Sequence, residues 1–266
     1  MENLLIKPNN NTNIPIDVTP ETAGWKYIGF RIERLKGGGA AQGRDDTNEL
    51  CLVVVQGQGE LFINEVSRGN FGDRMSPFDG LPHAIYLPKG TKWRVEATTE
   101  LELAICSAPS IAGNKALRQF RPEDLITETR GCGANTRYVT NILAEGDDAA
   151  DTLFVIELIT PGGHTSSYPP HKHDIDDFPT ETQLEETYYS RFNPPQGFAF
   201  QRVYTDDRSL DQALVLEEGT LTLVPRGYHP VAVCHGYDLY QLCVMAGPKR
   251  NWRFHNEAAH QWLLAK

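Results

Sequence analysis

The chain has 266 residues, of which 23% are charged, and its formal net charge is −10 at neutral pH. This length fits two domains of ordinary size. The acidic charge argues against nucleic acid as a partner, because binding to phosphates requires clustered basic surface. The longest unbroken apolar run is Leu50 to Val55, far short of the roughly 20 residues that span a bilayer, so we expect no membrane segment.

The first ten residues and the cysteines bear on the cellular location of the protein. Residues 1–10 (MENLLIKPNN) contain no basic region that leads into an apolar stretch, so we expect no export signal. The five cysteines form no Cys-x-x-Cys pair, and Cys51, Cys106 and Cys243 lie in apolar, strand-like runs. An odd number of thiols in such runs is typical of buried, reduced cysteines. We therefore expect a cytoplasmic protein.

Short runs rich in β-branched and aromatic residues alternate with Gly, Pro, Asn or Asp along the chain. In chain order they are Leu50–Val55, Gly59–Asn64, Lys92–Ala97, Leu101–Ser107, Arg137–Leu143, Leu153–Thr160, Glu186–Phe192, Phe198–Tyr204, Gly219–Val224 and Leu239–Ala246. This spacing predicts an all-β sandwich or barrel. Helical signals are limited to a turn opened by Pro122 and a C-terminal helix that Asn256 caps before Glu257–Leu264. The helices should therefore be few and peripheral.

The sequence contains an internal repeat. Leu87–Lys92 (LPKGTK) matches Val224–His229 (VPRGYH) when residue 88 falls on residue 225, an offset of 137. The same ungapped offset carries Cys106 onto Cys243. Self-similarity of this kind indicates two copies of one structural unit. We therefore expect two β-rich domains, residues 1–125 and 126–266.

A group of metal-binding side chains lies in the second copy. His171 and His173 are one residue apart in Tyr168–Asp174 (YPPHKHD). On a strand, residues i and i+2 point to the same face, so both imidazoles can be directed at one point. Glu186 and His229 each lie in a strand-like context with a turn signal beside it. Three imidazoles and a carboxylate suit one divalent transition ion, with zinc as the first expectation and manganese, iron or nickel as alternatives.

The choice of carboxylate depends on strand register. Alternation places Glu186, Tyr188 and Ser190 on one strand face, and Glu185 is the rival ligand one residue away. The repeat aligns Glu186 with Glu49 of the first copy, and this favours Glu186 as the ligand. Periodicity alone does not exclude Glu185.

The first copy lacks the histidines. At the same offset, Arg34 and Lys36 take the places of the His-x-His pair, and Lys92 takes the place of the third histidine. We therefore expect that only the second copy binds an ion.

With these ligands and this repeat, the chain resembles the 5-deoxy-glucuronate isomerase family of myo-inositol breakdown and, more widely, the uronate ketol-isomerases of pectin degradation. The resemblance is carried by Thr129–Asn141, Thr160–Asp174, Glu185–Gln201, Leu223–Pro230 and Ala246–Leu263. It implies a bicupin, two tandem cupin barrels, of which the first lacks the metal ligands. It also implies an aldose–ketose isomerisation of 5-deoxy-D-glucuronate to 5-dehydro-2-deoxy-D-gluconate, with a metal ion that stabilises the enediolate.

The sequence offers three candidates for the catalytic acid or base, namely Glu185, Tyr188 and Lys172. A carboxylate that binds no metal inside a dry barrel could have a raised pKa, which favours Glu185 or a partly released Glu186. Lys172 lies between two inward-facing histidines, so alternation predicts that it points outward. Tyr188 could instead only pack the barrel wall.

The substrate's carboxylate requires local cations in an acidic protein. Arg202 and Arg250 are the candidates, because a guanidinium can bind a carboxylate in a bidentate manner. Tyr204 and Tyr240 are further candidates for substrate contact. The expected partners are thus a uronate and, since bicupins often bury barrel faces between subunits, a second copy of the chain.

Two features leave alternatives open. Twelve residues, Asp174 to Glu185 (DIDDFPTETQLE), separate the second histidine from Glu186, and we expect this acidic insertion to be a solvated loop rather than a second cation site. The same ligand types also serve iron or copper dioxygenases, and a bicupin could bind a sugar without catalysis. Oxygen dependence and the effect of replacing His171 distinguish these classes.

Overall fold

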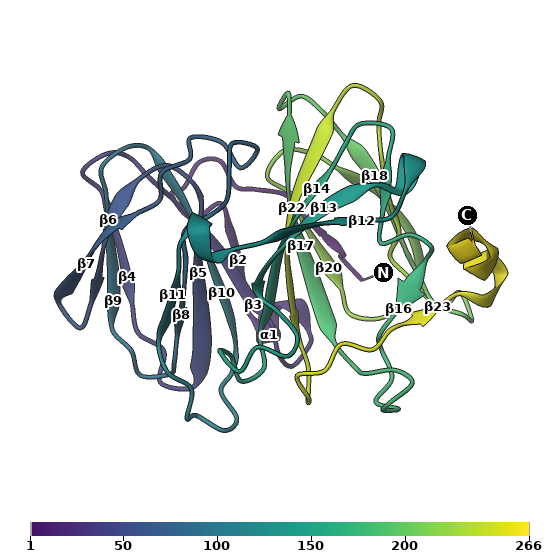
Figure 1. Cartoon of the computed structure of the whole chain (residues 1–266), viewed down its shortest axis with the longest axis horizontal. Coiled ribbons are helices and arrows are strands. Elements are labelled where there is room, and N and C mark those ends of the chain that lie inside the picture. Colours follow the sequence, from purple (N-terminus) through teal and green to yellow (C-terminus); the bar gives the residue numbers. More distant parts are fainter. Residues whose placement is uncertain (1, 266) are drawn as a thin grey trace. The chain divides into compact units, whose positions relative to one another are not determined.

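The computed structural model describes residues 2–265, and β-strands dominate it (Figure 1). The chain forms two compact units. Unit 1 contains the described residues up to Lys7, Thr127–Thr140 and the described residues from Ile156 onward, and unit 2 contains Pro8–Ile126 and Asn141–Val155. The chain passes from unit 2 to unit 1 after residue 126, one residue from the boundary proposed from the sequence. It also crosses between the two units after residues 7, 140 and 155.

Two antiparallel sheets form unit 2 within the described residues. The six-stranded sheet has the order β11 (Arg118–Phe120), β8 (Ala84–Leu87), β5 (Asn48–Gln56), β10 (Leu101–Pro109), β3 (Gly29–Leu35) and β2 (Ile16–Val18). The four-stranded sheet has the order β4 (Ala40–Gly43), β9 (Trp93–Ala97), β6 (Gly59–Ile63) and β7 (Val66–Phe71). The helix α1 (Pro20–Ala23) and the 3₁₀ turn η1 (Pro122–Asp124) are short additions.

An apolar core lies between these two sheets. Alternate residues of β5, Leu50, Leu52 and Val54, contribute to it from the larger sheet, and Leu61 and Val95 from the smaller one. Leu52, Val54, Leu61 and Val95 are fully buried. The β-branched and leucine-rich sequence of β5 suits a strand that is buried on both faces. The interior of unit 2 is thus filled by hydrocarbon.

Unit 1 has three sheets among the described residues. The largest has the order β1 (Leu5–Ile6), β20 (Leu221–Val224), β17 (Glu185–Asn193), β22 (Asp238–Ala246), β14 (Phe154–Thr160), β13 (Arg137–Leu143) and β12 (Thr127–Arg130). The others are β15 (Thr165–Ser166), β21 (Val231–Val233), β18 (Ala199–Tyr204) and β19 (Asp211–Leu216), and the pair β16 (His171–Lys172) and β23 (His255–Asn256). The 3₁₀ segments are η2 (Gly133–Asn135) and η3 (Ala258–Ala265).

The secondary structure expected from the sequence is confirmed in its main lines. Each predicted strand coincides with an observed one, and Pro122 opens the turn η1. The predicted C-terminal helix is the 3₁₀ helix η3, which begins at Ala258, whereas Asn256, the predicted cap, ends the strand β23. None of the helices within residues 2–265 is long and apolar enough to cross a membrane.

The repeat is visible in the strand order, but its alignment is wrong by one residue at β5. β5 pairs with β8 and β10 as β17 pairs with β20 and β22. On β5 it is Leu50 that faces the core between the sheets, whereas Glu49 faces the opposite side. On β17 it is Glu186 that faces inward, as the contacts below show. Leu50, not Glu49, therefore takes the place of Glu186, because a shift of one residue reverses the faces of a strand.

Glu49 has a structural role of its own. Its carboxylate is fully buried and accepts five hydrogen bonds. The donors are the Tyr86 hydroxyl, at 2.6 Å, the hydroxyl of Thr152, and the backbone N–H groups of Asp151, Thr152 and Leu153, at 2.6–2.7 Å. Hydrogen bonds to a buried charged acceptor are among the stronger ones in proteins. Glu49 thus fixes the 151–153 segment to β5 and β8.

We expect Glu49→Gln to lower the free energy of unfolding by about 2–4 kcal/mol, because the amide NH₂ would face N–H donors that then lose their acceptor. The measurement is the urea midpoint, with the exposed Glu100→Gln as the matched control. Equal midpoints for Glu49→Gln and the control would contradict this role.

Candidate metal centre

Three imidazoles converge inside unit 1. His171 begins β16, His173 follows one residue after this strand ends, and His229 lies in the turn between β20 and β21. The ligand nitrogens of these histidines lie within 4.8 Å of one another. The ring centroids of His171 and His173 lie 4.9 and 5.2 Å from that of His229. The histidines that the sequence predicts to be ligands thus come together.

Backbone contacts fix the orientation of each ring. His173 donates from Nδ1 to the carbonyl oxygen of Leu184, at 3.1 Å, and His229 donates from Nδ1 to that of Gly227, at 3.0 Å. His171 forms a hydrogen bond with the backbone of Pro169. A carbonyl oxygen can only accept, so Nδ1 of His173 and His229 carries the hydrogen, and Nε2 is the atom left to bind a metal. This is the arrangement that metal-binding histidines require.

Glu186 completes the group. Its Oε2 atom lies 3.0 Å from Nε2 of His173 and 3.1 Å from Nε2 of His229, and Cys243 donates to Oε1 at 2.7 Å. Burial opposes ionisation, but His229 and His173 outweigh it and hold the pKa of the Glu186 carboxyl well below its usual range. Burial, together with His229 and His173, lowers the pKa of His171 well below its usual value, which favours the neutral ligand form.

The donor set fits a divalent transition ion. Nε2 of His229 is buried and has no hydrogen-bond partner in the described part of the chain, although the Glu186 carboxylate is close. A buried polar nitrogen that lacks a partner is costly, and coordination of a cation would use its lone pair. Two of the rings have the tautomer fixed by a carbonyl, and the anionic oxygen of Glu186 lies beside them. Zinc, iron, manganese and nickel accept such mixed nitrogen and oxygen ligands.

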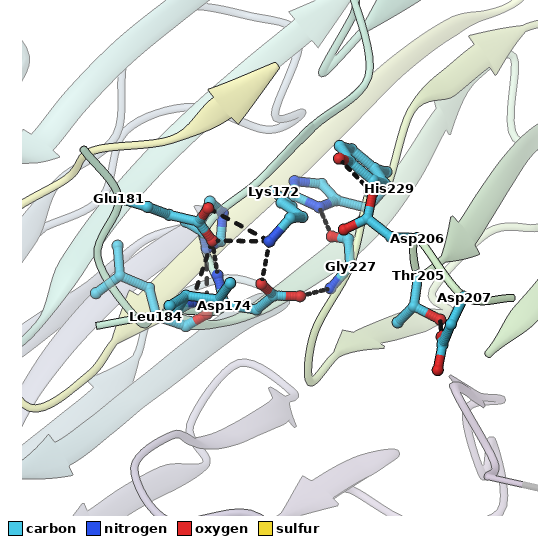
Figure 2. A network of polar contacts seen from close by, with 12 residues as sticks. Lys172, Asp174, Glu181, Leu184, Thr205, Asp206, Asp207, Gly227 and His229 are labelled. Atoms are coloured by element: carbon cyan, nitrogen blue, oxygen red, sulfur yellow. Dashed lines mark hydrogen bonds and ion pairs between the residues drawn. The ribbon is translucent and has the colours of Figure 1, made fainter. Parts of the chain in front are cut away.

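A network of polar contacts supports the centre from outside (Figure 2). The Lys172 ammonium donates to Asp174 at 2.7 Å and to Glu181 at 3.3 Å. Asp174 accepts from the N–H of Gly227 at 2.8 Å, and the carbonyl of Gly227 accepts from His229. Burial opposes the charge of Lys172, but the two carboxylates raise its pKa. Lys172 is therefore a cation whose contacts lead through Asp174 and Gly227 to His229.

The backbone at Gly227 requires glycine. Its φ is 88°, and a Cβ atom there would lie 2.4 Å from the carbonyl oxygen of Tyr204. Such a φ is strained for other residues, and such a contact is sterically forbidden. This explains why the turn VPRGYHP places glycine two residues before the histidine that it orients.

The acidic insertion is only partly the solvated loop that its composition predicts. Residues 175–180 are exposed, but Glu181 is buried and Asp174 is largely so. The Glu181 carboxylate accepts from the N–H groups of Asp174, at 2.7 Å, and Ile175, at 3.1 Å. Glu181 therefore stabilises the chain directly after His173, and the ion pairs with Lys172 make the burial of Asp174 and Glu181 tolerable.

Two cavities adjoin the metal centre. An outer cavity of about 920 Å³ is lined by His171, Arg137, Trp252 and Phe254, among others. An inner cavity of about 40 Å³ is lined by His171, Glu186, Tyr188 and Cys243, again with Arg137. Both cavities are lined by His171, Arg130, Arg137 and Trp252. A ligand in the outer cavity would therefore lie against the imidazole cluster at His171.

The three candidates for proton transfer lie in different surroundings. Tyr188 lines the inner cavity, its hydroxyl lies 3.1 Å from that of Ser167, and burial raises its pKa well above the usual value. Glu185 is buried on the other face of β17 from Glu186, as alternation requires. Lys172 is engaged in the ion pairs described above. Tyr188 is thus the one of these three that borders the cavity.

The residues that the sequence suggests for substrate contact line neither cavity. Arg202 is about half exposed and binds Asp211 through two contacts of 2.8 and 2.7 Å. The inward-facing neighbour is Gln201, which is fully buried and donates to the carbonyl of His229 at 3.1 Å. Because side chains alternate between the two faces of β18, Gln201 points inward and Arg202 points toward solvent.

The remaining candidates are engaged elsewhere. The Tyr204 hydroxyl donates to Glu257, and that of Tyr240 donates to Glu157 at 2.6 Å. Tyr240 lies on the opposite face of β22 from Cys243, since their positions differ by three, an odd number. Arg250 follows β22 in an irregular segment. These residues do not line the cavities.

Sequence reasoning missed two arginines. Arg130 and Arg137 line both cavities. They flank the glycine-rich turn of TRGCGANTR, so a hairpin prediction for this segment would have placed them side by side. Composition gave no such signal, because arginines at strand ends are common on solvated surfaces.

Comparison with known proteins assigns the chain to a family. The sequence matches the KduI/IolB family over residues 4–263. The chain belongs to this family. A 5-deoxy-glucuronate isomerase of Geobacillus thermodenitrificans is 44% identical over 97% of this chain and 93% of that protein. A protein of the same name from Bacillus subtilis is 39% identical over the full length of both.

Solved structures confirm the fold of this KduI/IolB member. The crystal structure of an IolB-like protein from Salmonella typhimurium LT2 superposes with a TM-score of 0.95 at 46% identity, over 98% of this chain and 99% of that one. An oxalate decarboxylase of Lactobacillus farciminis gives a TM-score of 0.67 at 13% identity, over 100% of this chain and 91% of that one, which shows likeness of fold alone. The all-β, bicupin class expected from the sequence is confirmed.

We expect Lys172→Met to lower the free energy of unfolding by about 3–5 kcal/mol, because it leaves the buried carboxylates of Asp174 and Glu181 without a counter-ion. Adding Glu181→Gln should recover part of that loss, so the double variant should be less destabilised than the sum of the single variants. Urea unfolding of the four proteins measures this. An unchanged midpoint with turnover abolished would instead make Lys172 a catalytic residue.

Proposed function

We propose that this KduI/IolB member is a metal-dependent aldose–ketose isomerase that converts 5-deoxy-D-glucuronate to 5-dehydro-2-deoxy-D-gluconate in myo-inositol catabolism. The observation that carries the proposal is the convergence of three imidazoles, of which His173 and His229 have Nδ1 held by a carbonyl and Nε2 beside the Glu186 carboxylate. Full-length relatives that bear this activity in their names supply the substrate.

The metal ligands would be His171, His173, His229 and Glu186. Zinc is the ion we expect, with manganese, iron or nickel as alternatives that the same donors accept. When bound, the ion would polarise the aldehyde oxygen and stabilise the negative charge that develops as the adjacent C–H bond breaks.

The reaction is internally balanced. One hydrogen leaves C2 of the aldose and one is gained at C1, while the hydroxyl proton of C2 is lost and an oxygen at C1 gains one. C1 is thereby reduced from aldehyde to alcohol and C2 is oxidised from alcohol to ketone. No external oxidant or reductant is needed.

Tyr188 is the residue to which we assign proton donation. Its hydroxyl borders the inner cavity beside Glu186, and Ser167 holds it at 3.1 Å. Because burial raises the pKa of Tyr188, the phenol keeps its proton at neutral pH and can donate a hydrogen bond from Oη to a developing oxyanion. Ser167 would orient this hydroxyl.

Lys172 supports the site without touching substrate, and Glu185 does not border it. Lys172 would position His229 through Asp174 and Gly227, as its contacts indicate. Glu185 lies on the far face of β17 from the cavity.

A cytoplasmic location accords with the five free cysteines, of which Cys51, Cys106 and Cys243 are buried.

The direct test of function is proton NMR of the metal-loaded protein with 5-deoxy-D-glucuronate in deuterated water. We expect the ketone to appear under strict anaerobiosis as fast as in air. Deuterium at the CH₂OH carbon that was the aldehyde carbon of the substrate would favour proton transfer over a direct hydride shift. Absence of conversion with metal bound, or a requirement for oxygen, would contradict the isomerase and favour a binding protein or a dioxygenase.

We expect His173→Ala to lower turnover at least about 1,000-fold, since loss of an electrophilic catalyst removes several kcal/mol of transition-state stabilisation. Chelation of the wild-type protein should have the same effect, and re-addition of the ion should restore activity to the wild type only. The exposed His235→Ala is the matched control. Full activity of metal-free protein would contradict the proposed mechanism.

A further inference from the structure

Two arginines face each other beside the metal centre. Arg130 ends β12 and Arg137 begins β13, and the two residues are directly opposite in the antiparallel ladder. Like charges at directly opposed positions destabilise a sheet. Both side chains line the inner cavity together with His171 and Glu186. This costly placement is explained if an anion lies between the arginines and the metal centre.

Arg137 carries a half-buried charge that has no counter-ion among the described residues. Its guanidinium donates from Nη1 to the carbonyl oxygen of Asn135 at 3.0 Å, and within residues 2–265 no carboxylate forms an ion pair with it. Burial, and then the charge of Arg130, lowers its pKa. A desolvated cation normally has an anionic partner.

The hairpin is shaped to accommodate this guanidinium. Gly131 has a φ of 76°, and a Cβ atom there would lie 2.7 Å from Nη1 of Arg137 and 2.1 Å from the carbonyl oxygen of Asn135. Only glycine therefore allows the chain to pass so close to the Arg137 side chain while Asn135 accepts from it. The position of Arg137 is thus a consequence of local backbone structure.

Arg130 can take part in the same interaction. Its ion pair with Glu128, through contacts of 3.0 and 3.1 Å, is partly solvent-exposed and hence contributes little free energy. Its guanidinium carbon lies 5.8 Å from the centre of the Trp252 ring, which restrains it at the cavity wall. In a protein with a net charge of −10, the two arginines make this wall locally positive.

We propose that Arg137, assisted by Arg130, binds the carboxylate of the substrate and thereby selects uronates over neutral aldoses. The inference rests on the proposed function, since it places the aldehyde end of the same molecule at the metal centre. A guanidinium offers paired donors that match a carboxylate. A neutral sugar would leave Arg137 desolvated and unpaired, so the pocket would reject it.

The first test measures binding without turnover. Metal-loaded protein is titrated calorimetrically with D-glucuronate and with its neutral amide, D-glucuronamide. The wild type should prefer the acid, and Arg137→Gln should weaken binding of the acid about 10- to 100-fold, the usual range for a charge-assisted hydrogen bond. It should not weaken binding of the amide and should strengthen it if anything, because no desolvated charge is then left unpaired. Arg202→Gln, an exposed arginine outside both cavities, is the matched control and should retain the preference.

Two further measurements separate a binding role from a structural one. The melting temperature of Arg137→Gln without ligand should equal or exceed that of the wild type, because the substitution relieves repulsion with Arg130. With 5-deoxy-D-glucuronate, the variant should show a raised KM, and Arg137→Lys should recover part of the loss. If Arg137→Gln does not fold, Arg130→Gln is judged by the same acid-to-amide preference.

An intact preference for the acid in a folded variant, or no preference in the wild type, would overturn the inference. If the wild type selects the acid through Arg137 but does not isomerise 5-deoxy-D-glucuronate, the carboxylate site stands and the proposed function fails.

Discussion

The hydrogen bonds that hold Nδ1 of His173 and His229 to backbone carbonyls are the constraint on which the site depends. Each bond fixes a tautomer, and each carbonyl belongs to a segment whose own conformation is tightly held. The position of the Gly227 carbonyl is fixed by a turn that only glycine can form and by the hydrogen bond that the N–H of Gly227 donates to Asp174. The carbonyl of Leu184 lies near the end of the insertion that Glu181 anchors. The backbone thus fixes the orientation of the imidazole rings. Lys172 neutralises the carboxylates of Asp174 and Glu181, which hold that backbone in place.

The two copies of the unit show how one scaffold supports two outcomes. In unit 2 the inward face of β5 carries Leu50 and Leu52, and the space between the sheets is filled by apolar side chains. In unit 1 the corresponding face of β17 carries Glu186 and Tyr188, and an inner cavity remains. A packed apolar interior has no room for an ion and no donors to bind it. The difference in side chains at equivalent positions is therefore sufficient to confine the proposed chemistry to the second copy.

Sequence patterns predicted what depends on local spacing. The His-x-His pair, the strand alternation of β17 and the turn signals beside His229 placed the cluster correctly, and the strand pattern predicted an all-β fold. The alignment of Glu49 with Glu186 favoured the residue that the structure places inward, but for a mistaken reason, because an ungapped repeat does not reveal a one-residue change of register. Arg137 was missed because its significance depends on the absence of a counter-ion within residues 2–265, and only a three-dimensional structure shows such an absence. Arg202 was chosen on strand position, although alternation turns it outward.

The measurement that tests the central claim most directly is the number of ions bound per chain. Protein stripped by chelation, reloaded with excess zinc or manganese and dialysed exhaustively would be analysed by elemental mass spectrometry against a quantitative amino-acid analysis. If the imidazole cluster of unit 1 is the binding site and the apolar interior of unit 2 excludes ions, each chain should retain one ion. Retention of none, or of two that both survive removal of His229, would contradict the account.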